Sequence, residues 1–158
     1  MTIKPKTITL SLFILSLAIL AACGPNRIFD ENKTIQNGNW NVQDKPIFEV
    51  PIDDILSRYD FYLSVRNAVE YPYSNLYIFI ATTFPDGRMS RDTVELILAG
   101  NDGRWLGSGM GNVKYNQFLF QKGVKFKQKG KYRFELEQAM RVNELKGIHD
   151  VGLRIEKE

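Results

Sequence analysis

The sequence predicts an all-β fold, an antiparallel β-sandwich of about eight strands with little helix, of the jelly-roll or immunoglobulin-like kind. Apolar and polar residues alternate with period two over most of the chain after residue 46, which is typical of half-buried strands. Turn-forming Gly, Asn and Asp residues separate these short stretches at regular spacing. The same part of the chain is rich in Phe and Tyr, which suit a pleated surface. These three observations favour two packed antiparallel sheets.

Alternating apolar side chains mark the predicted strands in order. They cover residues 48–52, 61–65, 76–84, 94–98, 118–120, 124–126, 132–136 and 151–155. The stretch 76–84 is nearly continuous in apolar residues, so we expect a central strand covered on both faces. The sequence F-P-D-G that begins at Phe84 supplies turn chemistry after it. The only candidates for helix are short turns within residues 53–59 and 137–145.

Residues 1–22 have the pattern of a bacterial signal peptide. Two lysines precede an uncharged run, residues 8–20, that is shorter than the about 20 residues a membrane-spanning helix needs. The sequence L-A-A-C that ends this segment resembles the bacterial lipobox, in which cleavage falls between Ala22 and Cys23 and the cysteine sulfur receives a lipid. The alternative is an ordinary cleaved signal followed by a free thiol. We favour lipidation, because the one cysteine of the chain stands where this chemistry needs it.

The rest of the chain divides into a lipidated N-terminus with a polar tether, residues 23–45, and a β-sandwich domain, residues 46–158. Removal of the signal reduces the formal net charge from +3 to +1, since the signal holds two lysines and no acid. So small a charge cannot supply the cationic face that nucleic-acid binding requires. A single cysteine also excludes an internal disulfide framework. We therefore expect an envelope protein whose lipid-modified Cys23 inserts in the bilayer.

No residue pattern indicates catalysis, a metal site or a cofactor. The sequence contains no G-x-S-x-G nucleophile motif with which its single histidine, His149, could form a catalytic triad. One histidine also cannot supply a His–His metal pair. The glycines of G-S-G-M-G, residues 107–111, fail the phosphate-loop spacing and indicate a flexible connection. The nearest carboxylate pairs, at residues 53–54 and 135–137, fit solvated faces better than a glycosidase site. The sequence therefore predicts a protein that is not an enzyme, with no cofactor and no small-molecule substrate.

Four residues are candidates for contact with a protein partner or a glycan: Tyr71, Tyr73, Arg104 and Trp105. Exposed aromatic side chains beside loops are common in binding sites. For Trp105 the alternative is a place in the core. The lysine-rich stretch 122–133 predicts a cationic hairpin face, for which contact with anionic lipid or glycan and simple protection of a strand edge are both open.

Several segments together are similar to one known family. They are R-I-F-D-E at 27–31, E-Y-P-Y-S-N-L-Y at 70–77, F-P-D-G-R at 84–88, R-D-T at 91–93, G-R-W-L-G-S-G at 103–109, Q-A-M-R from 138 and L-K-G-I-H-D-V-G-L-R-I-E up to 156. In this order, and with the lipobox, they resemble the GldH family of gliding motility lipoproteins of the Bacteroidetes. The resemblance implies an envelope-anchored lipoprotein that is required for gliding and linked to type IX secretion, with no enzymatic activity. Only Cys23 carries over as a defined functional position.

Two finer expectations accompany the resemblance. Residues 24–27 lack the acidic cluster that resembles a surface-export signal in these bacteria, which favours a periplasm-facing domain bound to proteins of the gliding or secretion machinery. Asp92, Thr93 and Val94 resemble the acceptor motif of Bacteroidetes O-glycosylation, so Thr93 is a candidate modification site. The alternative function is a carbohydrate-binding envelope lipoprotein, since β-sandwiches often bind glycans through exposed aromatic residues.

Overall fold

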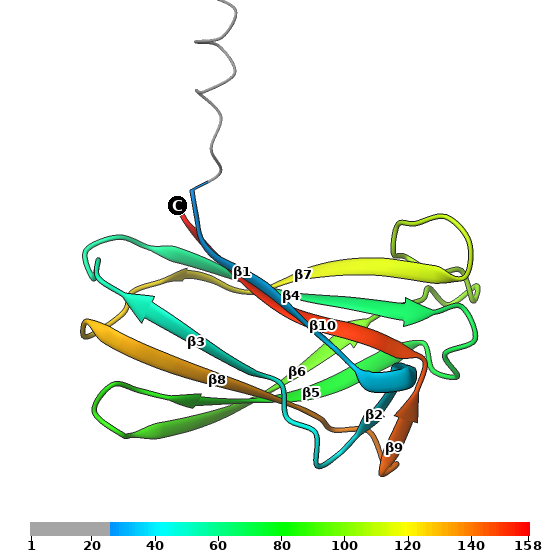
Figure 1. The fold of residues 1–158 in the computed structure, drawn as a ribbon. Helices are drawn as coiled ribbons and strands as arrows, with labels where there is room; N and C mark the ends of the chain where they lie inside the picture. Colours follow the sequence, from blue (N-terminus) through cyan, green and yellow to red (C-terminus); the bar gives the residue numbers. More distant parts are fainter. Residues whose placement is uncertain (1–25) are drawn as a thin grey trace, which may run out of the picture.

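The computed structural model describes residues 26–158. This part of the chain forms β-strands and one short 3-10 turn (Figure 1). The strands are β1 (Arg27–Thr34), β2 (Asn39–Asn41), β3 (Ile47–Ile52), β4 (Tyr59–Ala68), β5 (Asn75–Thr83), β6 (Met89–Ile97), β7 (Val113–Val124), β8 (Gly130–Gln138), β9 (Glu144–Lys146) and β10 (Ile148–Lys157), and the 3-10 turn is η1 (Gln36–Gly38). The all-β prediction is confirmed.

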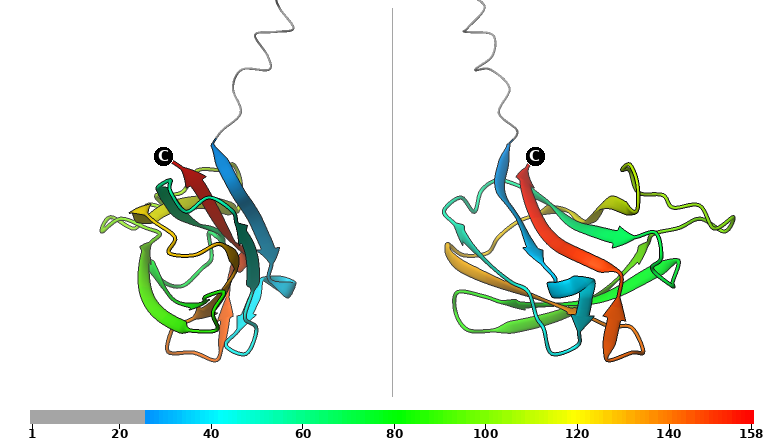
Figure 2. Two further views of the ribbon diagram at one scale, coloured as in Figure 1. Left: turned by 90° about the vertical axis from the view of Figure 1, so that its left-hand side faces the viewer. Right: turned by 45° about the vertical axis from the view of Figure 1, so that its right-hand side comes forward.

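Two four-stranded antiparallel sheets pack face to face. Sheet 1 has the order β1-β10-β4-β7, and sheet 2 has the order β3-β8-β5-β6. A two-stranded ribbon of β2 and β9 lies beside them. Figure 1 shows sheet 1 above sheet 2, and Figure 2 shows the same two layers from two other sides. The predicted β-sandwich is therefore confirmed.

The strands pair as one long nested hairpin. β1 pairs with β10, β2 with β9, β3 with β8, β4 with β7 and β5 with β6, all antiparallel. Two further pairings, of β10 with β4 and of β5 with β8, roll this hairpin into the two sheets. This is the strand order of a jelly roll. Of the two kinds of sandwich that the sequence predicts, the jelly roll is correct and the immunoglobulin-like order is wrong.

The core lies between the sheets and follows the predicted alternation. In β3, buried and exposed residues alternate without interruption along its whole length. In β4, the inward-facing Phe61, Leu63 and Val65 are each at most 2% exposed. Sheet 2 contributes Leu76, Ile78 and Leu136 to the core, and all three are fully buried. Burial of such side chains stabilises the fold by about 1.5–3 kcal/mol each.

The N-terminal part of the predicted tether belongs to the sandwich. β1 pairs with β10 from Arg27 opposite Glu156 to Thr34 opposite Asp150, and Trp40 of β2 is fully buried. The folded domain thus begins near residue 27 and not at 46. The strand is hidden in the sequence because β1 is an edge strand with charged residues on its half-buried face, where an interior strand carries apolar ones.

Three further local predictions are wrong. The stretch 118–120 lies inside a longer strand, β7, whose register with β4 shifts near Phe61, but the strand expected at 124–126 is absent, because β7 ends at Val124 and residues 125–126 belong to no strand. The predicted helical turns are absent from 53–59 and from 137–145, which contains the start of β9. β5 lies inside sheet 2, but only one of its faces is covered by a second layer, and Tyr77 on the other face is 37% exposed.

Candidate functional site

Three of the four predicted contact residues lie together beyond the ends of β4 and β6. The ring centroids of Tyr71 and Tyr73 are 5.6 Å apart, and those of Tyr71 and Trp105 are 6.4 Å apart. Tyr71 is 4% exposed, its hydroxyl donates to the Asn75 carbonyl at 3.0 Å, and burial raises its pKa. Tyr71 therefore positions the other two rings and is not itself accessible to a partner, contrary to the prediction.

The remaining three candidates differ in what they expose. Trp105 is half-buried and packs against the core, which favours the structural interpretation of this residue. Arg104 is exposed and forms an ion pair with Asp102 at 3.4 Å. Tyr73 is 37% exposed and borders a hollow of about 460 Å³. The other residues around this hollow are Tyr77, Ala139, Met140, Arg141 and Val142. Of the four candidates, Tyr73 is the one that faces this concave surface.

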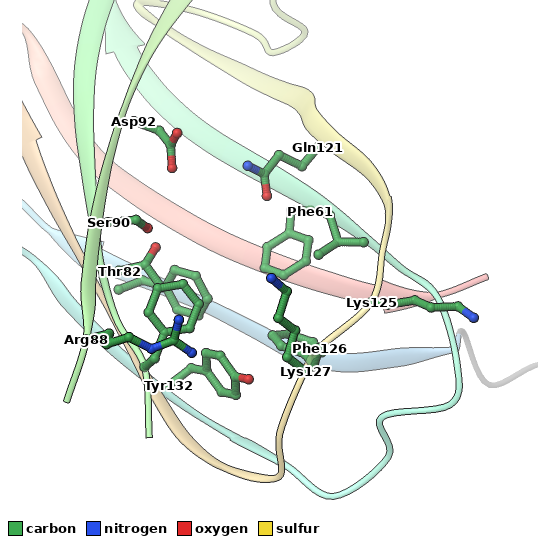
Figure 3. A pocket seen from close by; sticks show the side chains of 13 residues that line it. Phe61, Thr82, Arg88, Ser90, Asp92, Gln121, Lys125, Phe126, Lys127 and Tyr132 are labelled. Carbon is green, nitrogen blue, oxygen red and sulfur yellow. The ribbon is translucent and has the colours of Figure 1, made fainter. Parts of the chain in front are cut away.

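A second concave site, the inter-sheet pocket, lies between β6 and β7 (Figure 3). Its volume is about 260 Å³. Its apolar wall consists of Phe61, Phe84, Val124, Phe126, Tyr132 and Phe134, and its polar rim consists of Thr82, Arg88, Ser90, Asp92, Gln121, Lys125 and Lys127. In Figure 3, Lys127 points across the pocket toward Phe61, whereas Lys125 points away from it. The site thus combines aromatic faces with hydroxyl, carboxylate and ammonium groups.

The pocket exists because β6 and β7 are the outer strands of their sheets and do not pair with each other. Core side chains therefore reach the surface along this side of the sandwich. On the opposite side, the T-shaped contact of Phe29 with Phe48, with centroids 6.3 Å apart, joins β1 to β3. The aromatic residues of 124–134 were visible in the sequence as a strand pattern. Their role in a pocket was missed, because it depends on which strands end up at the sheet edges.

The lysine-rich stretch separates into paired and unpaired cations. Lys131 binds Glu49 at 2.9 Å, and Arg133 binds Glu135 at 2.9 Å. The ammonium of Lys131 lowers the pKa of Glu49 through its hydrogen bond. Within residues 26–158, no ion pair is formed by Lys122, Lys125, Lys127 or Lys129. Of these four lysines, Lys125 and Lys127 line the inter-sheet pocket and add positive charge to its rim.

The glycine-rich segment 107–111 is a packed turn and not a flexible connection. Ser108 and Tyr115 exchange two backbone hydrogen bonds, of 2.9 and 2.7 Å. A Cβ on Gly107 would lie 2.6 Å from the side-chain oxygen of Asn116, so only glycine fits there. The turn leaves Met110 98% exposed at its tip.

Thr93 and His149 are not among the residues that line the inter-sheet pocket. Thr93 is an exposed residue in the middle of β6 and pairs with Phe79 of β5, so its modification stays a prediction. His149 is half-buried in β10, with its Nδ1 against Gly38. In the described chain, no group of three or more His, Cys, Asp and Glu side chains is arranged to hold a metal ion.

The predicted signal peptide, with its cleavage at Ala22 and lipid attachment at Cys23, lies outside the described residues. Among residues 26–158, none of the helical structure is long and apolar enough to cross a bilayer.

Comparison with known proteins gives the chain a family. Residues 27–155, nearly all of the described part, match the GldH lipoprotein family. The chain is 37% identical over 153 residues to a gliding motility lipoprotein GldH homolog of Christiangramia forsetii, covering 92% of this chain and 93% of the relative. It is 32% identical over 154 residues to the gliding motility lipoprotein GldH of Flavobacterium johnsoniae, covering 93% and 95%. The chain therefore belongs to the GldH lipoprotein family, the lipoproteins of gliding motility.

Proposed function

We propose that this lipoprotein is a non-catalytic, membrane-anchored part of the gliding apparatus, that it supports type IX secretion, and that its domain faces the periplasm. The observation that carries the proposal is the family match over residues 27–155, together with relatives that are named for gliding motility. A jelly roll with an apolar core and two concave surface sites suits recognition of a partner protein.

The anchor is Cys23, acylated after cleavage at Ala22. Because β1 begins at Arg27, only four residue steps separate the lipidated cysteine from the folded domain. Four steps of chain reach at most about 14 Å. The domain therefore stays close to the bilayer surface, and partners reach it from the side or from above.

The groups that the fold brings together support binding of a ligand and not its catalytic conversion. His149, near the start of β10, packs against Gly38 and is not among the residues that line the inter-sheet pocket. The pocket itself holds one carboxylate, Asp92, beside Arg88 and Lys127. General acid–base catalysis of glycoside cleavage needs two carboxyl groups across the scissile bond. The lining is better suited to holding a ligand than to cleaving one.

Glycan binding is a second candidate function, favoured by the inter-sheet pocket. A sugar ring would stack on Phe84, the half-buried ring of the pocket wall, while Ser90, Gln121 and Lys127 offer hydrogen bonds to hydroxyl or acidic groups. Titration of the purified protein with fragments of envelope polysaccharide tests this function. Loss of binding in Phe84→Ala, together with unchanged binding in Tyr73→Ala, would place the glycan in the pocket. If no fragment produces binding heat or a chemical-shift change, glycan binding is contradicted.

Clean deletion of the gene, in an organism with no second copy, tests the leading proposal. We expect colonies that do not spread, cells that do not glide, and reduced release of type IX cargo into the medium. Complementation with the wild-type gene should restore all three. Normal gliding and normal secretion after deletion would contradict the proposal, and lost gliding with normal secretion would remove only its secretion part.

Protease treatment of intact cells tests the orientation. A periplasm-facing domain is protected until the outer membrane is permeabilised, whereas a surface-exposed domain is degraded at once. A surface-anchored protein of known exposure serves as the digestion control in the same cells.

A further inference from the structure

β6 is an open strand edge over most of its length; at its end, Leu106 of the following loop donates a backbone hydrogen bond of 2.9 Å to the Leu98 carbonyl and borders the same hollow as Ile97. It is the last strand of sheet 2, and β5 is its one neighbour among the described strands. The pairs Phe84–Arg88 and Ser74–Leu98 are joined by backbone hydrogen bonds of 2.8 Å at either end of the β5–β6 ladder. Hydrogen-bonded pairs alternate along an antiparallel ladder. The residues that turn their backbone N–H and C=O groups to the open side are therefore Met89, Arg91, Thr93, Glu95 and Ile97.

The side chains of these five residues are arranged symmetrically about Thr93. All five are exposed on the outer face of sheet 2. Arg91 and Glu95 stand two residues to either side of Thr93, and Met89 and Ile97 stand four residues to either side. Met89 is 71% exposed and Ile97 is 46% exposed. A strand with this pattern is complementary to itself when a second copy runs antiparallel to it.

We propose that two copies of this protein pair through β6, with Thr93 of each copy on the two-fold axis. Met89 then lies opposite Ile97 of the second copy, and Arg91 lies opposite Glu95 of the second copy. Both residues of each pair turn their backbone N–H and C=O groups to the open side of β6, so the two strands meet in hydrogen-bonded register. Opposite charges and apolar side chains directly across an antiparallel pair each stabilise it, and the two-fold axis doubles every contact.

The side chains at this edge are held on the face where the pairing needs them. The Arg91 guanidinium lies 4.0 Å from the centroid of Phe79, with an amino group 3.4 Å from Glu137. Glu95 accepts a hydrogen bond of 2.7 Å from Asn75. Both charged groups stay on the solvent side of sheet 2. On the pocket side of the strand, Asp92 would stand opposite the half-buried Val94 of the second copy.

The pairing is compatible with two lipid anchors in one membrane. An antiparallel strand pair has its two-fold axis perpendicular to the sheet, so sheet 1 of both copies lies on the same side of the joined sheet 2. The described chain begins with β1 in sheet 1, on the upper side in Figure 1. Both domains can therefore be tied to the same bilayer. This step rests on the proposed anchoring at Cys23, and the rest of the inference goes beyond the proposed function.

Register-specific disulfide cross-linking of the full-length lipoprotein in intact cells tests the proposal. Cα atoms across a hydrogen-bonded antiparallel pair are about 5.5 Å apart, within reach of a disulfide. Thr93→Cys should therefore give a disulfide-linked dimer on a gel without reducing agent. Arg91→Cys and Glu95→Cys should give a linked dimer only when the two variants are co-expressed. In the proposed dimer, residue 91 lies opposite residue 95 of the second copy and distant from residue 91 of that copy. Glu49→Cys, in the outer strand β3 at the other edge of sheet 2, is the matched control and should stay monomeric.

Charge reversal supplies a second, independent readout. Arg91→Glu places like charges opposite each other twice and should weaken self-association of the detergent-solubilised protein by about tenfold. The double variant Arg91→Glu/Glu95→Arg should restore it. The proposal is overturned if Thr93→Cys stays monomeric at normal protein levels, if Glu49→Cys links equally well, or if Arg91→Cys links alone. Glycosylation of Thr93 and this pairing exclude each other, because a glycan would occupy the axis, so a glycan on Thr93 in the native protein, seen as added mass, would confirm the modification and overturn the pairing. None of these readouts uses gliding, so the pairing and the motility role stand or fall separately.

Discussion

Asp150 is a carboxylate buried in β10, 5% exposed, that depends on one partner. Arg66 of β4, whose side chain is 52% exposed, donates a hydrogen bond to it from Nε and forms an ion pair with it through a terminal guanidinium nitrogen. Removing the guanidinium leaves a buried charge without a hydrogen bond. The exposed pair of Arg88 with Asp86 lacks this feature, because both groups can return to water.

Arg66→Met is therefore expected to lower the free energy of unfolding by about 1–3 kcal/mol. Arg88→Met should lower it by less than about 1 kcal/mol. Urea unfolding of both variants checks the difference. Equal losses would show that water reaches Asp150 freely.

Asp54 organises the turn between β3 and β4. The backbone N–H groups of Leu56 and Ser57 donate to its carboxylate at 2.9 and 3.2 Å, and the Lys157 ammonium donates at 2.8 Å. The hydrogen bond from Lys157 lowers the pKa of Asp54, and Asp54 raises the pKa of Lys157. The stabilisation that results from the lowered pKa of Asp54 is present above the ordinary pKa of Asp, 3.8, and is lost as the pH falls toward the lowered pKa. The stabilisation that results from the raised pKa of Lys157 is present below pH 10.5, the ordinary pKa of Lys, and is lost as the pH rises through the raised pKa.

The melting temperature of Asp54→Asn should consequently lie below that of the wild type by a constant amount between about pH 5 and 9. The gap should narrow below pH 3.8 and again above 10.5. Melting curves of both proteins across this range measure it. A gap that stays constant down to pH 2 would mean that the carboxylate charge contributes nothing.

At the scale of residues, the sequence singled out Tyr71, Tyr73 and Trp105 one by one, but it predicted neither that they meet nor how far each is exposed. Tyr71, Tyr73 and Trp105 come from two loops that nothing local joins, and they do meet. Which ring is buried depends on the hydrogen bond from the Tyr71 hydroxyl to Asn75 and on the packing of the loop after β6. Neither has a signature in the spacing of residues.

Gly152 allows three strands to approach each other on the outer face of sheet 1. It pairs with Asn32 of β1 on one side and with Ser64 of β4 on the other. Across it, the Ser64 hydroxyl donates to the Asn32 side-chain oxygen at 2.7 Å. A Cβ on Gly152 would overlap both of these atoms.

Gly152→Ala should therefore destabilise the protein by about 1–3 kcal/mol through overpacking. In a background that carries Asn32→Ala and Ser64→Ala, the same substitution should cost less, because the obstructing atoms are gone. Denaturant unfolding of the four proteins measures the coupling. An equal cost in both backgrounds would place the effect in the backbone and not in this contact.

At the scale of elements, strands with one clean apolar face were predictable, the edge strand β3 among them, whereas the edge strand β1 was not. β3, β4, β5, β8 and β10 alternate strongly because they bury one face on the core. β1 carries Glu31 and Lys33 on its half-buried face, and the Lys33 ammonium lies 5.9 Å from the ring of Phe48. Such charged positions are how edge strands avoid pairing with other chains, and they also conceal the strand from pattern analysis.

For the whole molecule, the inclusion of β1 in sheet 1 makes a direct prediction about truncation. Deletion of residues 27–34 removes the outer strand of sheet 1 and the contact of Phe29 with Phe48. The shortened protein should be degraded in the envelope. Deletion of residues 24–26, which precede β1, should leave protein levels unchanged. Immunoblots of envelope fractions compare the two, and equal accumulation would mean that β1 is dispensable for folding.

The nested order of the strands could not be predicted from periodicity. Alternation indicates which face of a strand is buried, but the jelly roll is fixed by pairs as distant in sequence as β1 with β10. The inter-sheet pocket and the open edge of β6 both follow from that order. This is why the fold class was accessible from the sequence, whereas the concave site between β6 and β7 required the structure.

The most direct test of a membrane-anchored role in gliding is the spreading of a strain whose only copy carries Cys23→Ser. The same variant also carries Leu20→Ala, which gives the small residues at both positions that a general signal peptidase site needs, so that the folded domain accumulates unlipidated. We predict that this protein is found in the soluble envelope fraction at normal levels and that the colonies do not spread. A strain that spreads normally with its protein in the soluble fraction, or a Cys23→Ser protein that remains in the membrane, would contradict the account.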